Sequence, residues 1–420
     1  MARLKIRIGQ RSLNDDIADI CSYGKWNKQL GDKLCAFLFA VSPLLQHYKG
    51  LYKDAGFTAY LIILPWMLLR LLQMGCHKKI QSRHVVTFPL VAYFAFSSVI
   101  HGITVSKLLY NGFMIFLCVL FEFGCFNVRY IFRYASYVCG FASLVLVIQY
   151  FCYYVLGFHL CIVPVSALLE ESSQWVAGAQ TGLINIRGAS NGFYRPSAFF
   201  LEPSHMFIYC FPVLCICLFS KGMTKSRLIF ALLISLGILL STSGMGIVCC
   251  LGVWVCYYLL YYDKTNANIA KVKNIFSARN LLIVSGVILF VVILYFSVDS
   301  VANTVNRILS SGSSSAFSGR LGQASKLVKG LSGKSLLVGL TDDASNITYN
   351  LPGFFATLYK KGVIGVLLSY WFYAKGLFKL KAAGFWMSFI ILILSFFSAH
   401  THGTFYMMFF VSLLMEEYRR

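Results

Sequence analysis

The sequence predicts an all-α, polytopic membrane protein with about 12 transmembrane helices, and three observations carry this prediction. The chain is 58% hydrophobic and only 12% charged, about half the charged share of a soluble domain, and its mean hydropathy is +0.71. Its apolar residues form continuous blocks of roughly 20 residues, the length of a membrane-crossing helix. Its basic residues are divided among the short segments between these blocks, which is typical of membrane-protein loops rather than of a nucleic-acid-binding surface.

Twelve apolar blocks are predicted to cross the membrane. They lie near residues 30–46, 57–75, 86–104, 108–126, 134–157, 199–219, 228–241, 245–262, 281–298, 362–379, 384–399 and 402–416. The resulting organisation is a polar cytoplasmic segment 1–33, helices one to five in 34–157, a loop 158–198, helices six to nine in 199–298, a second loop 299–361, and helices ten to twelve with a short tail in 362–420. The basic N-terminal segment lacks the pattern of a cleaved signal peptide, so the first helix is expected to be an uncleaved anchor.

The distribution of basic residues predicts the orientation. With the N-terminus in the cytoplasm, the inner segments carry roughly twice as many of the 37 Lys and Arg residues as the outer segments do, the usual bias of cytoplasmic loops. As one straight helix, 228–262 would run about 52 Å against a hydrocarbon core of about 30 Å, so we expect a turn at Ser241-Thr-Ser-Gly244. Both long loops, 158–198 and 299–361, then face outward, and loops of such length tend to carry function.

Ionisable residues gather where the first long loop enters a membrane helix. The stretch is Arg195-Pro-Ser-Ala-Phe-Phe-Leu-Glu202-Pro-Ser-His205. A charged group at a membrane border is costly to keep there, so it is a functional candidate by default. Glu202 and His205 are three residues apart, which predicts one shared helix face, and either can take a proton from an attacking hydroxyl. The alternative is structural: Arg195 pairs with Glu202 as a strut, and His205 caps the helix or packs.

Arginines of the outer loops are the candidate ligands for an anion, because a guanidinium presents a rigid donor fork to phosphate oxygens. These are Arg187, Arg195 and Arg320. Arg320 is expected at the start of a helical stretch, 320–332, whose lysines suit a solvated face or lipid headgroups. Three further residues carry side chains that suit sugar hydroxyls, although they suit turns equally well: Tyr194, Tyr349 and Asn350.

No metal or other cofactor is expected. The 14 cysteines fall almost entirely inside apolar helices or inner loops and lack metal-site spacing, so we expect them to fill membrane packing rather than to form disulfides or bind zinc. No nucleotide-binding motif lies on a cytoplasmic loop. Glu122, inside a predicted span, is either a hydrogen-bonded structural acid or part of a proton relay.

With these features the chain resembles the O-antigen and capsule polymerases of bacteria, the Wzy type, and their broader O-antigen ligase superfamily. The stretch from Arg195 to His205 is similar to the family's arginine, aromatic, Glu-Pro-Ser sequence at the end of the central periplasmic loop. Leu240-Ser-Thr-Ser-Gly-Met-Gly246 resembles the family's turn two helices later. The segment from Asn350-Leu-Pro-Gly to Lys361-Gly-Val-Ile-Gly365 is similar to its Asn, apolar, Gly-x-x-Gly entry to a late helix.

The resemblance implies a GT-C-like glycosyltransferase of the bacterial inner membrane, with both termini cytoplasmic. It would transfer glycan from an undecaprenyl-diphosphate-linked donor to a lipid-linked acceptor, and a chain-length regulator protein is a candidate partner; nucleic acid is not. Two alternatives stay open. An O-antigen ligase would use a lipid A-core acceptor, but 299–361 lacks the histidine usual in ligases. A flippase or transporter would need polar residues near the bilayer midplane and inverted repeats.

Overall fold

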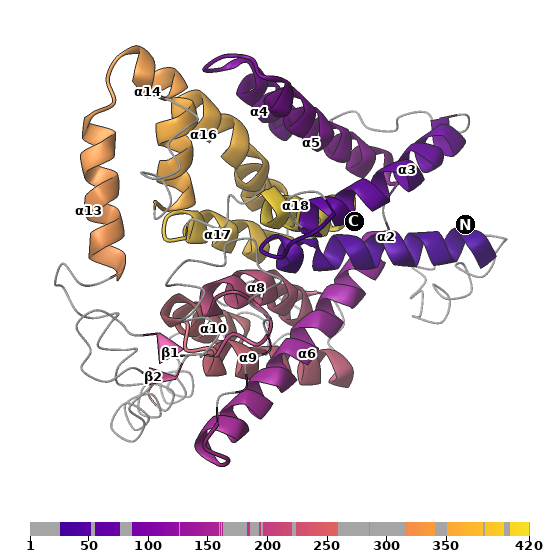
Figure 1. Ribbon diagram of the computed structural model, residues 1–420, viewed down its shortest axis with the longest axis vertical. Helices are drawn as coiled ribbons and strands as arrows, with labels where there is room; N and C mark the ends of the chain where they lie inside the picture. The colour runs from indigo at the N-terminus through magenta and orange to yellow at the C-terminus, as the bar shows by residue number, and fades with distance from the viewer. Residues whose placement is uncertain are drawn as a thin grey trace, which may run out of the picture.

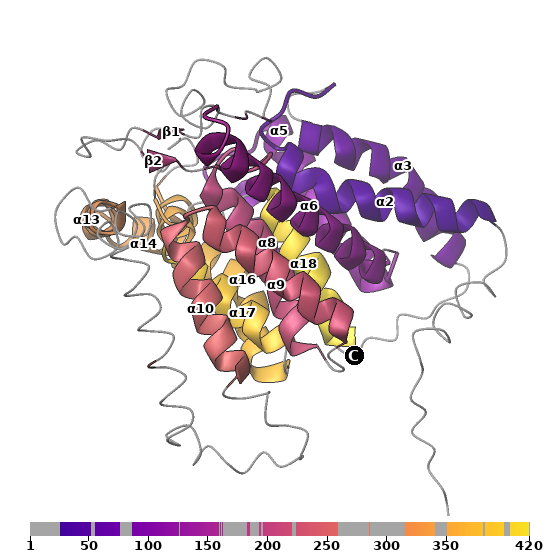
Figure 2. The same ribbon diagram turned by 90° about the horizontal axis from the view of Figure 1, so that it is seen from below.

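The chain is represented by a computed structural model (Figures 1 and 2). It describes residues 26–51, 55–75, 86–125, 127–158, 160, 162, 183–184, 193–194, 196–220, 224–258, 285, 316–340, 351–380, 383–398 and 404–419. The described chain is mostly helical, so the all-α prediction is confirmed. Its only strands in these ranges are β1 (Leu183–Ile184) and β2 (Phe193–Tyr194), a short antiparallel pair.

Five helices build the first part of the chain, and they coincide with the first five predicted apolar blocks. They are α2 (Trp26–Leu45), α3 (Ala55–Gly75), α4 (Phe88–Val99), α5 (Val105–Phe123) and α6 (Val128–Tyr154). The third differs in length, because the predicted block 86–104 continues to residue 104 whereas α4 ends at Val99. The chain leaves the helix at Ile100, which is extended, and then takes positive φ at His101 and Gly102. Thr104 starts α5 by accepting a hydrogen bond from the Lys107 amide.

The middle of the chain forms α8 (Pro203–Phe219), α9 (Lys225–Leu240) and α10 (Gly244–Tyr257). The predicted division of 228–262 is confirmed, since α9 and α10 are separated by the turn Ser241–Ser243. Thr242 has a φ of 52°, which no α-helix accommodates, and the Ser243 hydroxyl caps α10 by accepting from the Gly246 amide. The predicted block 281–298 lies outside the described residues except for Ser285.

The last part contains α13 (Ala316–Lys329), α14 (Lys334–Val338), α16 (Gly353–Lys379), α17 (Ala383–Ser395) and α18 (Thr404–Arg419). The predicted stretch 320–332 is therefore helical but begins earlier, so Arg320 lies inside α13 rather than at its start. The predicted span 362–379 also begins earlier, at Gly353, and its backbone breaks at Gly362, where φ is 64°. A Cβ at residue 362 would collide with the Leu337 carbonyl, so glycine allows α14 to pack closely against α16.

Helix ends that are predicted to lie on the same side of the membrane contact one another. On the predicted outer side, the Tyr48 hydroxyl donates to the Phe199 carbonyl at 3.1 Å, and Tyr150 donates to the Leu240 carbonyl at 2.7 Å. On the predicted inner side, the Thr87 hydroxyl donates to the Glu122 carboxylate at 2.9 Å. Glu122 also accepts from the Thr87 amide, so it ties α5 to the start of α4 as a structural acid.

Apolar side chains cover the outside of the bundle as well as its interior. On α6 they form an exposed helical stripe at Tyr137, Phe141, Leu144, Ile148 and Phe151. Polar residues of the same helix, such as Ser143 and Gln149, face inward and are buried. By length and composition two described helices, α5 and α6, can cross a membrane, and several apolar helices are shorter. An outer apolar surface of this kind is compatible with a membrane protein.

Candidate functional site

The segment that leads into α8 is held by a buried side chain of α6. Gln149, which is 5% exposed, accepts a hydrogen bond from the Ala198 amide at 3.0 Å and donates to the Leu160 carbonyl at 3.0 Å. The segment is also bonded internally, because the Ser197 hydroxyl donates to the Phe200 carbonyl at 2.6 Å. Ala198 has a φ of 55°, a conformation unfavourable for a residue with a side chain. These contacts fix the backbone of the residues that directly precede Glu202.

Glu202 is the N-cap residue of α8 and not part of its first turn. Its backbone is extended, with φ −140° and ψ 153°, while its carbonyl accepts from the His205 amide at 3.0 Å. The Ser204 hydroxyl donates to the half-buried Glu202 carboxylate at 2.9 Å. Glu202 and His205 are thus the N-cap and third helical residues of α8, and that their side chains share a face stays a prediction. Pro203 has no N–H and fits the first helical position, so the helix begins after the carboxylate.

His205 lies inside the junction of three helices. It is 2% exposed, and its imidazole stacks on that of His47, just beyond α2, with ring centroids 4.9 Å apart and planes 3° from parallel. From α18, the Tyr406 hydroxyl donates to the His205 carbonyl at 3.3 Å. The start of α8 thus brings a carboxylate, two imidazoles and a phenol into one neighbourhood.

The turn between α9 and α10 supports α8 from the other side. Ser241, Thr242 and Ser243 are all buried. The turn is followed by Gly246, whose missing side chain leaves room for Phe207 of α8, since a Cβ would lie 3.1 Å from the Phe207 Cγ. The expected turn is therefore present, and in the described contacts the residues that follow it pack against the helix that begins after Glu202.

Most of the other predicted site residues fall outside what the structure describes. Arg187, Arg195, Tyr349 and Asn350 lie outside the described residues altogether. Tyr194 and Arg320 are described in their backbones alone: Tyr194 pairs with Leu183 in the strand ladder, and Arg320 lies in α13. The diphosphate-binding and glycan-binding assignments of these residues therefore stay predictions. In the described ranges, no group of three or more His, Cys, Asp and Glu residues is placed to hold a metal ion.

The structure adds residues that the sequence did not single out. His47 follows the end of α2, Gln149 lies in α6 and Tyr406 lies in α18, all far in sequence from residue 202. The sequence signal that could have pointed to His47 is the polar run Gln46-His47-Tyr48 at the end of an apolar helix, a position like that of Glu202. Neither Gln149 nor Tyr406 stands out from the many polar and aromatic residues of the predicted spans.

Comparison of the chain with models of known protein families and with characterised proteins gave no match. A function therefore has to be inferred from the residues themselves and from the contacts they make.

Proposed function

We propose that the chain is a glycosyltransferase of the bacterial inner membrane that polymerises undecaprenyl-diphosphate-linked repeat units into O-antigen or capsular polysaccharide on the periplasmic face. It would have about 12 spans in a GT-C-like arrangement. The observation that carries the proposal is the half-buried Glu202 carboxylate at the start of α8, where His47 and Tyr406 pack against His205 in the first turn of the same helix. It lies at helix ends predicted to face outward, where a lipid-linked substrate presents its glycan.

The reaction needs few groups, because the donor already carries its leaving group. The acceptor hydroxyl oxygen bonds to the anomeric carbon of the donor, and the bond from that carbon to the diphosphate oxygen breaks. The electron pair leaves with the polyprenyl diphosphate, and the hydroxyl proton passes to Glu202. Arg187, Arg195 and Arg320 are the proposed ligands of the charge that develops on the diphosphate.

Within this site we assign the proton transfer to Glu202 and a positioning role to His205. Glu202 is half-buried, so its carboxylate can meet a sugar hydroxyl. His205 is 2% exposed and stacks on His47, so a bulky glycan does not reach its ring without rearrangement. The ring instead fixes the first turn of α8 against α2 and α18, and a positioned general base typically contributes about 10²–10⁴-fold to the rate.

A silver-stained lipopolysaccharide gel of a strain that lacks the gene tests the class of reaction. A polymerase predicts cores capped by single repeat units. Bare cores with lipid-linked polymer would indicate a ligase, and bare cores with single lipid-linked units retained on the cytoplasmic side would indicate a transporter. An unchanged ladder in an organism that makes such a polymer would contradict the proposal.

A further inference from the structure

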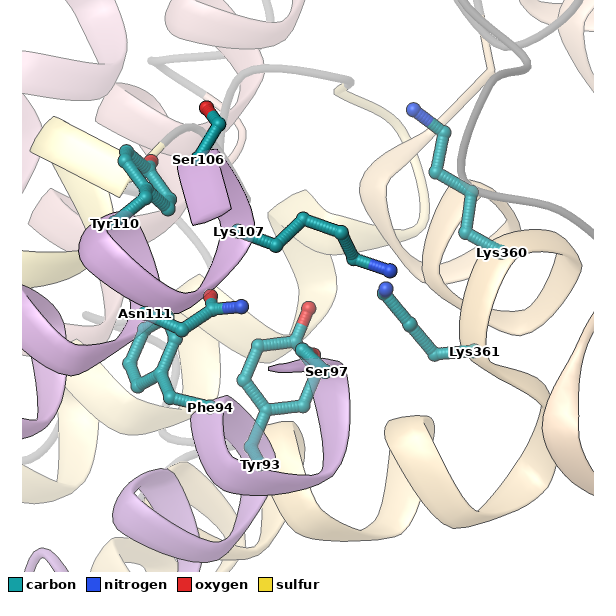
Figure 3. Close-up of a pocket in the computed structure, with 9 residues that line it drawn as sticks. All are labelled: Tyr93, Phe94, Ser97, Ser106, Lys107, Tyr110, Asn111, Lys360 and Lys361. Carbon is teal, nitrogen blue, oxygen red and sulfur yellow. The ribbon is translucent and has the colours of Figure 1, made fainter. Parts of the chain in front are cut away.

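A second polar site lies between α4, α5 and α16, in a cavity of about 340 Å³ (Figure 3). Its lining includes three lysines, Lys107, Lys360 and Lys361, and five neutral polar side chains, among them Tyr93, Ser97 and Asn111. In Figure 3 the amino groups of Lys107 and Lys361 point toward one another, and the Asn111 amide and Tyr93 hydroxyl are directed to the same space. Of the described residues that line the cavity, none is acidic.

Lys107 is held in this orientation by the loop before its own helix. Its Nζ donates to the Ile100 carbonyl at 2.7 Å and to the Gly102 carbonyl at 3.0 Å. The positive φ of His101 and Gly102 shapes the loop that presents these oxygens. The His101 Nε2 in turn donates to the Lys360 carbonyl at 2.9 Å, which fastens the loop to α16. One wall of the cavity is therefore built by a contact between residues 259 positions apart.

Lys361 is placed by the break in α16. It directly precedes Gly362, where the backbone leaves helical geometry, and it is 9% exposed although it carries an amino group. Asn111 and Ser97 are likewise buried. Lys107 and Lys361 direct two positive charges at the same pocket, and the field of two such charges attracts an anion. The buried amide of Asn111 and hydroxyl of Ser97 add neutral polar groups beside these charges, so the pocket suits an anion.

The anion is best matched by a phosphate ester at the membrane border. Lysine binds phosphate oxygens as a point charge, and hydroxyl and amide groups can donate to the remaining oxygens. The cavity volume of about 340 Å³ lies at the lower end of the usual range for ligand pockets, about 300–1,000 Å³. It therefore suits a phosphate or diphosphate headgroup better than a whole oligosaccharide.

We propose that this cavity binds the diphosphate of the lipid-linked acceptor, an inference that rests on the proposed function for the identity of the lipid. The diphosphate of the donor is the leaving group and belongs beside Glu202. The acceptor reacts at the far end of its oligosaccharide, so its own diphosphate must be held elsewhere. The cavity meets this need because it is built by other helices than those around Glu202. The cavity lies on α4, α5 and α16, whereas α8 packs with α6, α9, α10, α17 and α18 (Figure 1).

The test is to count bound undecaprenyl diphosphate by native mass spectrometry on the purified full-length protein. Wild type should bind two molecules. Lys361→Gln should bind the second about tenfold to a hundredfold more weakly, the loss expected for one charge-assisted hydrogen bond. Lys361→Arg keeps the charge and should retain the second molecule, which separates charge from folding. Lys329→Gln, an exposed lysine of α13, is the matched control and should behave as wild type.

Two further arms separate the sources of the phosphate and the two proposals. Phosphatidylglycerol should not compete for the second molecule; competition at similar concentration would make this a phospholipid site and overturn the assignment. In polymerisation assays Lys361→Gln should raise the KM for the acceptor and leave that for the donor unchanged. Equal binding by wild type and Lys361→Gln would overturn the cavity as a site. If the second diphosphate binds to wild type and Lys361→Arg but not to Lys361→Gln, and the wild type shows no polymerisation, the cavity is an anion site. The proposed function and the acceptor assignment would then both be contradicted.

Discussion

The start of α8 and the cavity between α4, α5 and α16 differ in the charge that they carry and in how many parts of the chain supply it. Glu202 is a single acid next to its own helix end, with a bond to Ser204 two residues away. The cavity assembles several cations from α5 and α16, and it depends on a loop bonded across the two segments. The bond between Ser204 and Glu202 lies within one helix start, whereas the cavity is lost when the packing of α4, α5 and α16 changes. The two sites should therefore respond differently to mutation.

The largest effect is expected from Gly362→Ala in the cavity region. A side chain at a φ of 64° is strained by about 1–2 kcal/mol, and its Cβ would collide with the Leu337 carbonyl of α14. We expect a loss of at least about 2 kcal/mol in the free energy of unfolding, measured by thermal unfolding in detergent, together with loss of the second bound diphosphate. Gly112→Ala is the matched control, because nothing lies within 4 Å of a Cβ there. Equal stability of the two variants would show that α14 does not constrain the break.

A smaller and more selective effect is expected from Gln149→Leu in the α8 region. It removes the partner of the Ala198 amide and of the Leu160 carbonyl, which should cost about 1–3 kcal/mol. We expect kcat to fall about tenfold because Glu202 loses its fixed approach, with the KM for donor nearly unchanged. Tyr150→Phe loses one bond on the neighbouring residue, to the Leu240 carbonyl. It should lower stability without lowering kcat, and a similar kcat loss in both variants would assign the effect to general destabilisation.

The smallest effect is expected from Ser204→Ala. This change removes the one hydrogen bond that the Glu202 carboxylate accepts among the described contacts. The bond orients the carboxylate, so we expect a two- to tenfold loss of kcat, in line with about 1 kcal/mol for a hydrogen bond, and no change in the second diphosphate site. Ser98→Ala removes a bond to the Phe94 carbonyl within α4 and should leave kcat unchanged. Turnover of Ser204→Ala equal to that of Ser98→Ala would show that the orientation of Glu202 does not depend on Ser204.

The contrast between a site within one helix start and a site assembled from distant segments explains what the sequence can predict. The helices follow from apolar blocks and their breaks, and Glu202 stands out because an acid at the end of an apolar block is rare. The N-cap position of Glu202 depends on Pro203 and is missed by counting residues along a helix face. Lys107 and Lys361 appear in the sequence as two outer positive charges, since no spacing or period connects positions so far apart. The stacking of His47 on His205 depends in the same way on the packing of distant helices.

The most direct test of the proposed reaction is the turnover of Glu202→Gln with purified lipid-linked donor and acceptor. Glutamine keeps the shape of the side chain and can still accept the bond from Ser204, while it removes the basic oxygen that takes the acceptor proton. We predict that kcat falls about 10²-fold or more, with both diphosphate molecules still bound. Turnover within about threefold of wild type, after correction for folded protein, would contradict the assignment of Glu202 as the base, since a positioned base contributes at least about 10²-fold.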